Sequence, residues 1–269
     1  MNNNYRIFIC THKDIPFDYK KIGVNKKHYT ILSQVKGVEP NGCDVIDISD
    51  DDFVKRFKIG YGELTNIHYL YTHQELIKDL DYIGICHYRR FFLDLLLANV
   101  KVKEDIMAIK NRPIQHTNYQ EYDIVHIKEH IDIINDLMKE HYGDLYDSFK
   151  ETMTDKQMHH CNMVVLPKKV FLEYCEFIFD ILAKFDEYIG VSNDEEVRKH
   201  ISGIIDKCRN RDINLQVRVQ GLLAERLTDA FIREKSKTYS IHESKLMKLF
   251  SPKEEIHIWE GGLPIRNSK

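Results

Sequence analysis

The chain has 269 residues, of which 43% are hydrophobic and 30% are charged, and its formal net charge is -3 at pH 7. This is the composition of a globular protein, and the chain is long enough to bury a sizeable core. The slightly negative charge argues against a nucleic-acid-binding domain, which usually has a basic surface. We therefore expect no nucleic-acid partner, and any basic function must be local.

Six cysteines are scattered along the chain, and no two of them form a C-x-x-C pair. Their spacing fits neither a zinc ribbon nor a disulfide framework, and single thiols suit a reducing compartment. Residues 1–6 lack the apolar run of a signal peptide. The most apolar stretch, residues 91–100, contains Asp94 and is too short to span a bilayer. We expect a cytoplasmic protein, with peripheral contact at the inner face of the cell membrane left open.

The first predicted element is a strand over residues 5–10, which are aromatic or β-branched at most positions. The polar residues Thr11, His12 and Lys13 follow it directly. In α/β sheets ligands bind at the carboxyl ends of the strands, so these three side chains are candidates for ligand contact. An ordinary turn is the alternative.

Residues 14–60 contain several glycines and prolines and predict long loops. Asp50, Asp51 and Asp52 are expected to cap a helix that begins near Phe53, because aspartate is favoured at helix N-termini.

Later elements alternate between helix and strand. Apolar spacings of three and four predict helices, and short β-branched runs predict strands. The predicted helices are residues 63–76, 129–152, a long helix after Pro167, 194–208 and 216–232, and the predicted strands are 82–86, 123–126 and 162–166. Strands separated by helices indicate an α/β fold with a largely parallel central sheet and a helical C-terminal portion. We expect one domain over residues 1–235 and a tail, residues 236–269, that packs on it or is partly flexible.

The richest polar cluster follows the second predicted strand and comprises His87, Tyr88, Arg89 and Arg90. Guanidinium groups bind phosphate oxygens in a bidentate fork and stay charged at any working pH. His87 could donate to the same anion, which would suit a diphosphate leaving group. The alternative is that both arginines pair with surface carboxylates.

Asp79 and Asp81 form a D-x-D pattern, which many nucleotide-sugar enzymes use to hold a divalent metal. The pattern precedes a strand, at the wrong edge of the sheet for a ligand site, and indicates a helix-to-strand turn. His126 and His130 could share a helix face, but the spacing places no third ligand. His159 precedes a strand and could line a cleft. We expect no metal site and no required cofactor, although a divalent metal stays possible.

The last cluster lies on the predicted helix 216–232, where Arg218, Glu225 and Arg226 surround Gly221. Gly221 allows close approach of a ligand or of another backbone. Glu225 could serve as a general base, or it could pair with an arginine.

Several of these motifs occur in one order in a known family. They are the strand ending in Thr11-His12-Lys13, Glu63 at a helix start, residues 81–92, Asn162-Met163 before a helix, and residues 221–227. In these motifs the chain resembles the capsular polysaccharide biosynthesis proteins long catalogued as a domain of unknown function, now regarded as galactofuranosyltransferases. The similarity spans roughly residues 5–232.

The resemblance implies a glycosyltransferase-A-like fold that binds a nucleotide sugar. It implies an inverting transfer of galactofuranose from UDP-galactofuranose to a hydroxyl of a cell-surface polysaccharide or lipid-linked glycan, beside other polysaccharide-assembly enzymes. Another UDP-hexose as donor, or a noncatalytic glycan- or nucleotide-binding module, are the alternatives.

An inverting transfer needs a base for the acceptor hydroxyl and stabilisation of the UDP leaving group. We assign Glu225 as the base, with Glu63 second and Asp194 third. The predicted donor-binding residues are Thr11, His12 and Lys13 for the uridine or its phosphates, His87, Tyr88, Arg89 and Arg90 for the diphosphate, Asn162 for sugar hydroxyls, and Arg218 and Arg226.

Overall fold

The computed structural model describes residues 4–39, 42–96, 106–110, 112–159, 161–249, 256–260 and 263–265. Within these residues, eleven strands form one sheet and two short strands form a second. The strands are β1 Tyr5–Thr11, β2 Tyr29–Ser33, β3 Asp44–Asp47, β4 Tyr82–His87, β5 Arg90–Phe92, β6 Ile106–Ile109, β7 Arg112–Pro113, β8 Gln157–Met158, β9 Val164–Pro167, β10 Ile241–Ser244, β11 Leu246–Leu249, β12 Ile256–Glu260 and β13 Leu263–Ile265.

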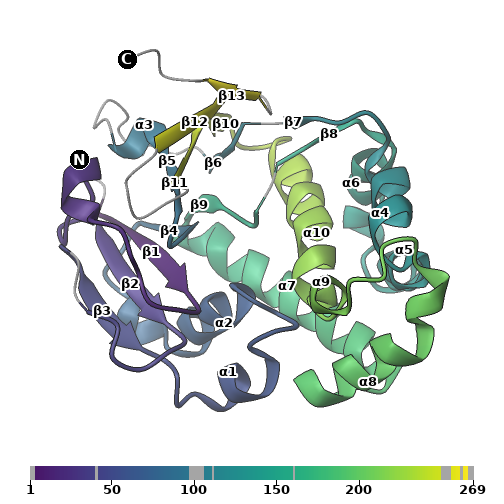
Figure 1. The fold of residues 1–269 in the computed structure, drawn as a ribbon. Helices are drawn as coiled ribbons and strands as arrows, with labels where there is room; N and C mark the ends of the chain where they lie inside the picture. The colour runs from purple at the N-terminus through teal and green to yellow at the C-terminus, as the bar shows by residue number, and fades with distance from the viewer. Residues whose placement is uncertain are drawn as a thin grey trace.

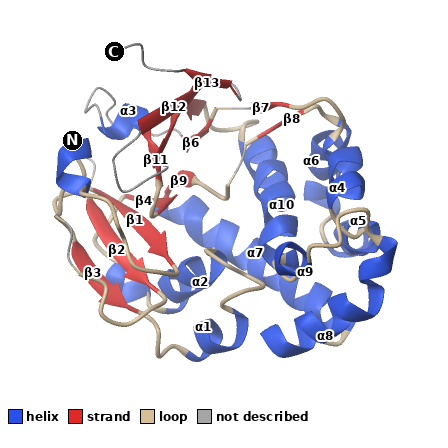
Figure 2. Cartoon of the chain, viewed as in Figure 1, coloured by secondary structure: helices blue, strands red, loops and turns tan. Residues whose placement is uncertain are grey.

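The helices lie mostly on one side of the large sheet, and one short helix, Leu93–Leu96, lies apart from the others, as Figure 1 and Figure 2 show. They are α1 Asp52–Phe57, α2 Leu64–Thr72, α3 Leu93–Leu96, α4 Asn118–Val125, α5 Lys128–His141, α6 Gly143–Thr154, α7 Lys168–Ile189, α8 Asp194–Ile204, α9 Ile213–Gln216 and α10 Val219–Lys235, with 3-10 turns at Tyr19–Ile22, Gln74–Leu76 and Ile205–Lys207.

The centre of the large sheet runs in the order β3-β2-β1-β4-β9-β6-β10. Strands β3, β2, β1 and β4 are all parallel to one another. Strand β9 is antiparallel to both of its neighbours, and β10 is parallel to β6. Because four consecutive strands are parallel, their carboxyl ends lie at one edge, where the polar residues after β1, β2 and β4 meet.

Strands β1, β2 and β4 are buried on both faces, as is typical of parallel strands. Phe8 and Cys10 of β1 pack into the core shared with the helices, whereas Ile7 and Ile9 pack into a second core on the opposite face. This alternation follows from the two-residue period of a strand. The long helix α7 buries Phe171, Tyr174 and their neighbours against the first core.

The predicted fold class is confirmed: the protein is α/β, its central sheet is mostly parallel, and helices dominate residues 168–235. Strands β1, β4 and β9 and helices α2, α7 and α10 lie where the sequence predicts them. The Asp51 carboxylate accepts a hydrogen bond from the Val54 N–H at the start of α1, as expected.

Two local predictions are wrong. Residues 123–126 are not a strand but the end of α4, which a capping box at Thr117 and Gln120 initiates. Residues 14–60 are not only loops, because β2 and β3 lie among them. Residues 129–152 are helical as predicted, in two helices that meet at Tyr142 and Gly143.

The tail beyond residue 235 extends the sheet on two sides. Strand β10 pairs with β6, and β11 pairs with β5 and β12. Met247 and Leu249 of β11 are buried in the core opposite the main helices. In the described part of the chain, no helix is both long and apolar enough to cross a membrane.

Candidate functional site

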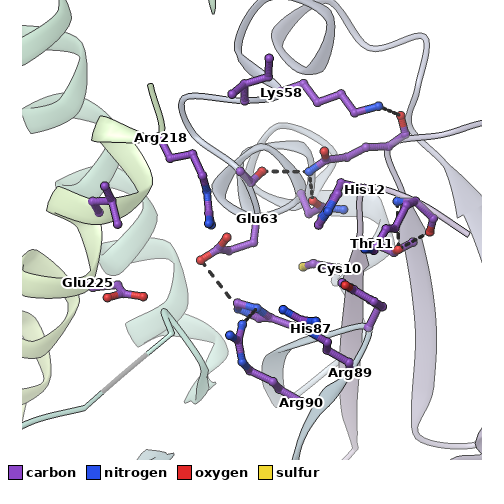
Figure 3. Close-up of a pocket in the computed structure, with 17 residues that line it drawn as sticks. Cys10, Thr11, His12, Lys58, Glu63, His87, Arg89, Arg90, Arg218 and Glu225 are labelled. Atoms are coloured by element: carbon purple, nitrogen blue, oxygen red, sulfur yellow. Dashed lines mark hydrogen bonds and ion pairs between the residues drawn. The ribbon is translucent and has the colours of Figure 1, made fainter. Parts of the chain in front are cut away.

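A cavity of about 430 Å³ opens at the carboxyl ends of β1, β2 and β4, and α10 lines its far side. We call it the strand-end cavity. Figure 3 shows side chains from these separate elements converging on it, with Glu225 contributed by α10 and Glu63 by the start of α2. Its described lining is Cys10, Thr11, His12, Lys13, Gln34, Lys58, Ile59, Gly62, Glu63, Asn66, His87, Tyr88, Arg89, Arg90, Arg218, Leu222 and Glu225.

The strand-end cavity is strongly basic although the chain is acidic. Five lining residues are Lys or Arg and two are Glu, a formal excess of three positive charges in a chain of net charge -3. Arg218 and Arg89 form no ion pair with any described residue, and Arg89 instead lies over the Tyr88 ring, 5.6 Å from its centroid. Cations left without carboxylate partners at a strand edge can bind an anion such as a phosphate.

The hydrogen bonds of its two ring nitrogens fix His87 in one neutral tautomer. Nε2 lies 2.7 Å from the Cys161 carbonyl oxygen and therefore donates, while Nδ1 lies 2.9 Å from an Arg90 guanidinium nitrogen and therefore accepts. Burial lowers the pKa of His87 to about 4, and although Glu63 opposes this shift, Arg90 adds to it. In this arrangement His87 has no N–H left for a ligand, so it orients Arg90 rather than binding a diphosphate itself.

Glu63 is anchored from behind by a buried chain of hydrogen bonds. The Asn162 amide donates to Glu63 Oε1 at 2.9 Å, the Thr228 hydroxyl donates to Asn162 Oδ1 at 3.0 Å, and the Tyr174 hydroxyl lies 2.9 Å from the Thr228 hydroxyl. Burial opposes ionisation of Glu63, but the Asn162 amide and Arg218 are among the groups that hold the pKa of its carboxyl below the usual range. Glu63 is therefore a fixed carboxylate at the cavity wall.

The backbone before β9 turns sharply to supply these contacts. Cys161 and Asn162 have φ angles of 76° and 50°, in the left-handed region that non-glycine residues rarely adopt. From this turn the Cys161 carbonyl faces His87 and the Asn162 amide faces Glu63. One short segment thus positions groups at the ends of both β4 and α2.

Glu225 is held more loosely than Glu63. Its nearest described partner is Arg226, at 3.5 Å, and a quarter of its side chain (25%) is exposed. Burial raises the pKa of Glu225, with Arg226 opposing and Glu63 adding to the shift. A carboxylate with a raised pKa in a cavity is suited to accept a proton.

Ten of the twelve predicted site residues line the strand-end cavity. The two others are Asn162 and Arg226. Asn162 is buried behind Glu63, so it reaches a ligand only through that carboxylate. The Arg226 guanidinium faces Tyr122, 5.1 Å from the ring centroid, donates to the Leu222 carbonyl oxygen and is outside the described cavity lining.

Asp194, the third candidate for the base, lies outside the described cavity lining. Its carboxylate accepts hydrogen bonds from the Ile59 and Gly60 N–H groups at 2.7 and 2.8 Å. It fixes the loop that carries Lys58 and Ile59 into the cavity wall.

Seven lining residues were not among the predicted site residues: Cys10, Gln34, Lys58, Ile59, Gly62, Asn66 and Leu222. Gln34 follows β2, and recognising β2 as a parallel strand would have placed Gln34 at this edge. Lys58 and Ile59 come from the loop after α1, and no sequence pattern marks them. Asn66 lies on the first turn of α2.

In the described part of the chain, no three His, Cys, Asp or Glu residues are arranged to hold a metal ion. The Asp81 carboxylate accepts a hydrogen bond from the Asn4 N–H at the opposite end of β4, which confirms the helix-to-strand turn. His130 lies 3.1 Å from His200, and His126 lies 3.3 Å from Gln216.

This sheet order, with a ligand-sized cavity at its carboxyl edge, defines a protein of the glycosyltransferase-A-like fold class. The solved apo structure of WbbM, a bifunctional glycosyltransferase, is similar, with a TM-score of 0.69 and 18% sequence identity over 99% of this chain and 48% of that chain. The chain therefore spans about half the length of WbbM. Residues 6–236 match the family described as domain of unknown function DUF4422, and the chain belongs to that family. No curated protein matches it.

Proposed function

We propose that the protein is an inverting glycosyltransferase that moves galactofuranose from UDP-galactofuranose to a hydroxyl of a cell-surface polysaccharide or lipid-linked glycan. The observation that carries this proposal is the strand-end cavity, where unpaired cations lie opposite the carboxylate of Glu225. The fold shared with a bifunctional glycosyltransferase supports it. The choice of galactofuranose rests on the family resemblance of the motifs around residues 81–92.

In the proposed reaction, the acceptor hydroxyl attacks the anomeric carbon of the donor sugar. Glu225 takes the hydroxyl proton as the new carbon–oxygen bond forms. The bond from the anomeric carbon to the β-phosphate oxygen breaks, and UDP leaves with the electron pair. Attack from the face opposite the leaving group inverts the anomeric configuration.

The leaving diphosphate requires positive charge already in place. Arg89, Arg90 and Arg218 line the cavity, and we assign this role to them in place of a divalent metal. The hydrogen bond to His87 fixes Arg90, so its guanidinium is oriented before the donor binds. Thr11, His12 and Lys13 lie at the end of β1 and are assigned to the uridine or its phosphates.

Glu63 is assigned to ligand binding rather than to proton transfer, with Glu225 retained as the base. Its lowered pKa makes it a weak base, and Asn162 already occupies one carboxylate oxygen. A fixed carboxylate is a suitable acceptor for hydroxyl groups of the bound sugars. The location of the protein at the inner face of the cell membrane, beside other assembly enzymes, is part of the same proposal.

The experiment is thermal unfolding with UDP, UDP-galactofuranose, UDP-galactopyranose, UDP-glucose and GDP-mannose, each with and without chelator. A ligand at one hundred times its Kd raises the free energy of unfolding by about 2.7 kcal/mol. We expect stabilisation by the UDP compounds, greatest with UDP-galactofuranose, and unchanged by chelator.

Release of UDP and formation of a β-linked galactofuranoside on a glycan acceptor then measures transfer itself. Stabilisation that chelator abolishes and manganese restores would contradict the metal-independent site. Binding of UDP-galactofuranose without transfer to any glycan acceptor would favour a noncatalytic binding module.

A further inference from the structure

Two apolar side chains lie among the charged and polar groups of the strand-end cavity. Ile59 and Leu222 are the only aliphatic residues in its described lining. Ile59 is 43% exposed, and Leu222 is partly buried. The proposed reaction uses neither of them. Because an aliphatic side chain forms no hydrogen bonds, it can contact a ligand only through its apolar surface.

A backbone contact brings these two residues to one wall of the cavity. The Gly221 N–H donates to the Gly60 carbonyl oxygen at 2.9 Å. Ile59 directly precedes Gly60, and Leu222 directly follows Gly221. The Asp194 carboxylate accepts a hydrogen bond from the Ile59 N–H at 2.7 Å, from outside the described lining. Ile59 is therefore held in the cavity wall by its backbone, although its side chain is exposed.

The position of Leu222 on α10 indicates which part of a substrate it meets. Arg218, Leu222 and Glu225 are four and three residues apart, which is the spacing of one helix face, and all three line the cavity. With a rise of about 1.5 Å per residue, Leu222 lies about 6 Å along the helix from Arg218 and about 4.5 Å from Glu225. Figure 3 shows Arg218 and Glu225 on the same side of the cavity, away from Thr11.

The transferred sugar lies between the groups that Arg218 and Glu225 serve. In the proposed reaction, Arg218 binds the diphosphate and Glu225 takes the proton of the acceptor hydroxyl. The hydroxyl attacks the sugar from the face opposite the diphosphate, so the sugar is between them. Leu222 lies between Arg218 and Glu225 on the same helix face and is therefore at the level of this sugar.

We propose that Leu222 and Ile59 form an apolar wall that keeps water away from the anomeric carbon of the transferred sugar, an inference that rests on the proposed function. Water is the competing nucleophile. Its oxygen would bond to the anomeric carbon and its proton would pass to Glu225. The bond to the β-phosphate oxygen would break, releasing UDP with the electron pair and free galactofuranose. Aliphatic side chains disfavour a water molecule at this position, because they offer it no hydrogen bond.

The test measures UDP release from UDP-galactofuranose with no acceptor present, which reports hydrolysis alone. Leu222→Asn replaces the aliphatic side chain with a polar one of similar shape that can bind water. We expect hydrolysis by this variant to be about 10-fold faster than by the wild type, a factor of the size that single apolar contacts in a pocket supply. The affinity for UDP, measured by calorimetry, should be unchanged.

Two further variants complete the comparison. Ile59→Ser should accelerate hydrolysis less than Leu222→Asn does, because the Ile59 side chain is already exposed. Leu172→Asn is the control, since it changes a partly buried leucine of α7 that is outside the described cavity lining. It should hydrolyse the donor at the wild-type rate.

Hydrolysis by Leu222→Asn no faster than by the wild type, in a protein that still binds UDP, would overturn the inference and leave the proposed function intact. An equal acceleration in Leu172→Asn would also overturn it, because the effect would then come from a general loosening of the fold. Failure of the wild type to bind UDP-galactofuranose would contradict the proposed function and this inference together. If Leu222→Asn does not fold, Ile59→Ser decides the question, because an exposed side chain contributes little to the core.

Discussion

Helix α10 lines two cavities of similar size whose charges are arranged in opposite ways. The second, which we call the His159 cavity, measures about 470 Å³ and is lined by Asp155, His159, Asp229, Ile232, Arg233, Ser236, Ile241 and Glu243. In it, His159 Nδ1 lies 2.7 Å from Asp229 and Nε2 lies 3.3 Å from Glu243, and Arg233 lies 2.6 Å from Asp155. Each charged side chain of this cavity forms an ion pair with another one.

The strand-end cavity, in contrast, leaves Arg89 and Arg218 without ion pairs among the described residues. Glu225 and Asp229 illustrate the difference, because they lie one helical turn apart on α10. Asp229 forms an ion pair with His159 at 2.7 Å, whereas Glu225 has only a 3.5 Å contact with Arg226. Paired charges stabilise the fold, and unpaired charges in a cavity indicate a binding site.

The largest expected effect comes from removing one carboxylate in each cavity. Glu225→Gln should lower the rate of transfer about 10²- to 10⁴-fold, the usual contribution of a general base, with UDP affinity unchanged. Glu243→Gln, the matched control, should leave the rate near that of the wild type. Initial rates and calorimetric UDP affinities check both. A rate for Glu225→Gln within threefold of the wild type would remove it from the role of base.

The second prediction concerns stability and pH. Asp229 and Glu243 raise the pKa of His159 to about 9 against the opposing effect of burial. Because the folded-state pKa lies above the unfolded value of 6.5, the stabilisation is complete below pH 6.5 and is lost as the pH rises through 9. It amounts to at most about 3 kcal/mol.

Denaturant unfolding between pH 6 and 10 measures this dependence. Asp229→Asn should be less stable than the wild type at pH 6 and should show a flatter profile. If the free energy of unfolding changes with pH equally in the two proteins, His159 does not titrate as described. Glu225→Gln, in the other cavity, should keep the wild-type slope.

The third prediction compares one arginine from each cavity. Arg89→Ala should weaken UDP binding about 10-fold, because it removes a charged partner of the diphosphate, without a loss of stability. Arg233→Ala should destabilise the protein through its contact with Asp155 but leave UDP affinity unchanged. Calorimetry and thermal unfolding of both variants test the pair, and a reversed pattern would contradict the comparison.

The smallest expected effect is on stability and comes from the buried hydrogen bonds that link Glu63 to Asn162, Thr228 and Tyr174. Thr228→Val removes the hydroxyl between Asn162 and Tyr174 and should lower the free energy of unfolding by about 1 kcal/mol. Thr154→Val is the control, because the Thr154 hydroxyl is exposed and bonds only to helix carbonyls. Equal free energies of unfolding for the two variants would show that these buried hydrogen bonds do not stabilise the protein.

The edge of the sheet that carries the site could be predicted from the sequence. Thr11 and His87 each end a strand of strong β-branched character, and the carboxyl ends of parallel strands gather at one edge. Glu225 followed from the helical spacing around Gly221. Gln34 was not predicted as a site residue because the strand before it, β2, has only five residues and lies in a segment rich in glycine and proline.

The position of Arg226 outside the described cavity lining has a geometric cause. Adjacent residues on a helix point about 100° apart, so Arg226 could not share the direction of Glu225. Tyr122, which packs against the Arg226 guanidinium, lies on α4, and the sequence predicted a strand for residues 123–126 in place of the end of this helix. The hydrogen bonds of His87 likewise depend on the backbone turn at Cys161, which no spacing in the sequence reveals.

The excess of positive charge in the strand-end cavity also affects how fast a ligand arrives. A concave basic surface on a protein of net charge -3 focuses its field at one opening, while the rest of the molecule repels anions. A diphosphate is therefore steered toward the cavity during diffusion, and uncharged glycans are not. Salt screens such fields over about 8 Å at physiological ionic strength, so the association rate of the nucleotide should fall as salt rises, while that of a neutral acceptor stays constant.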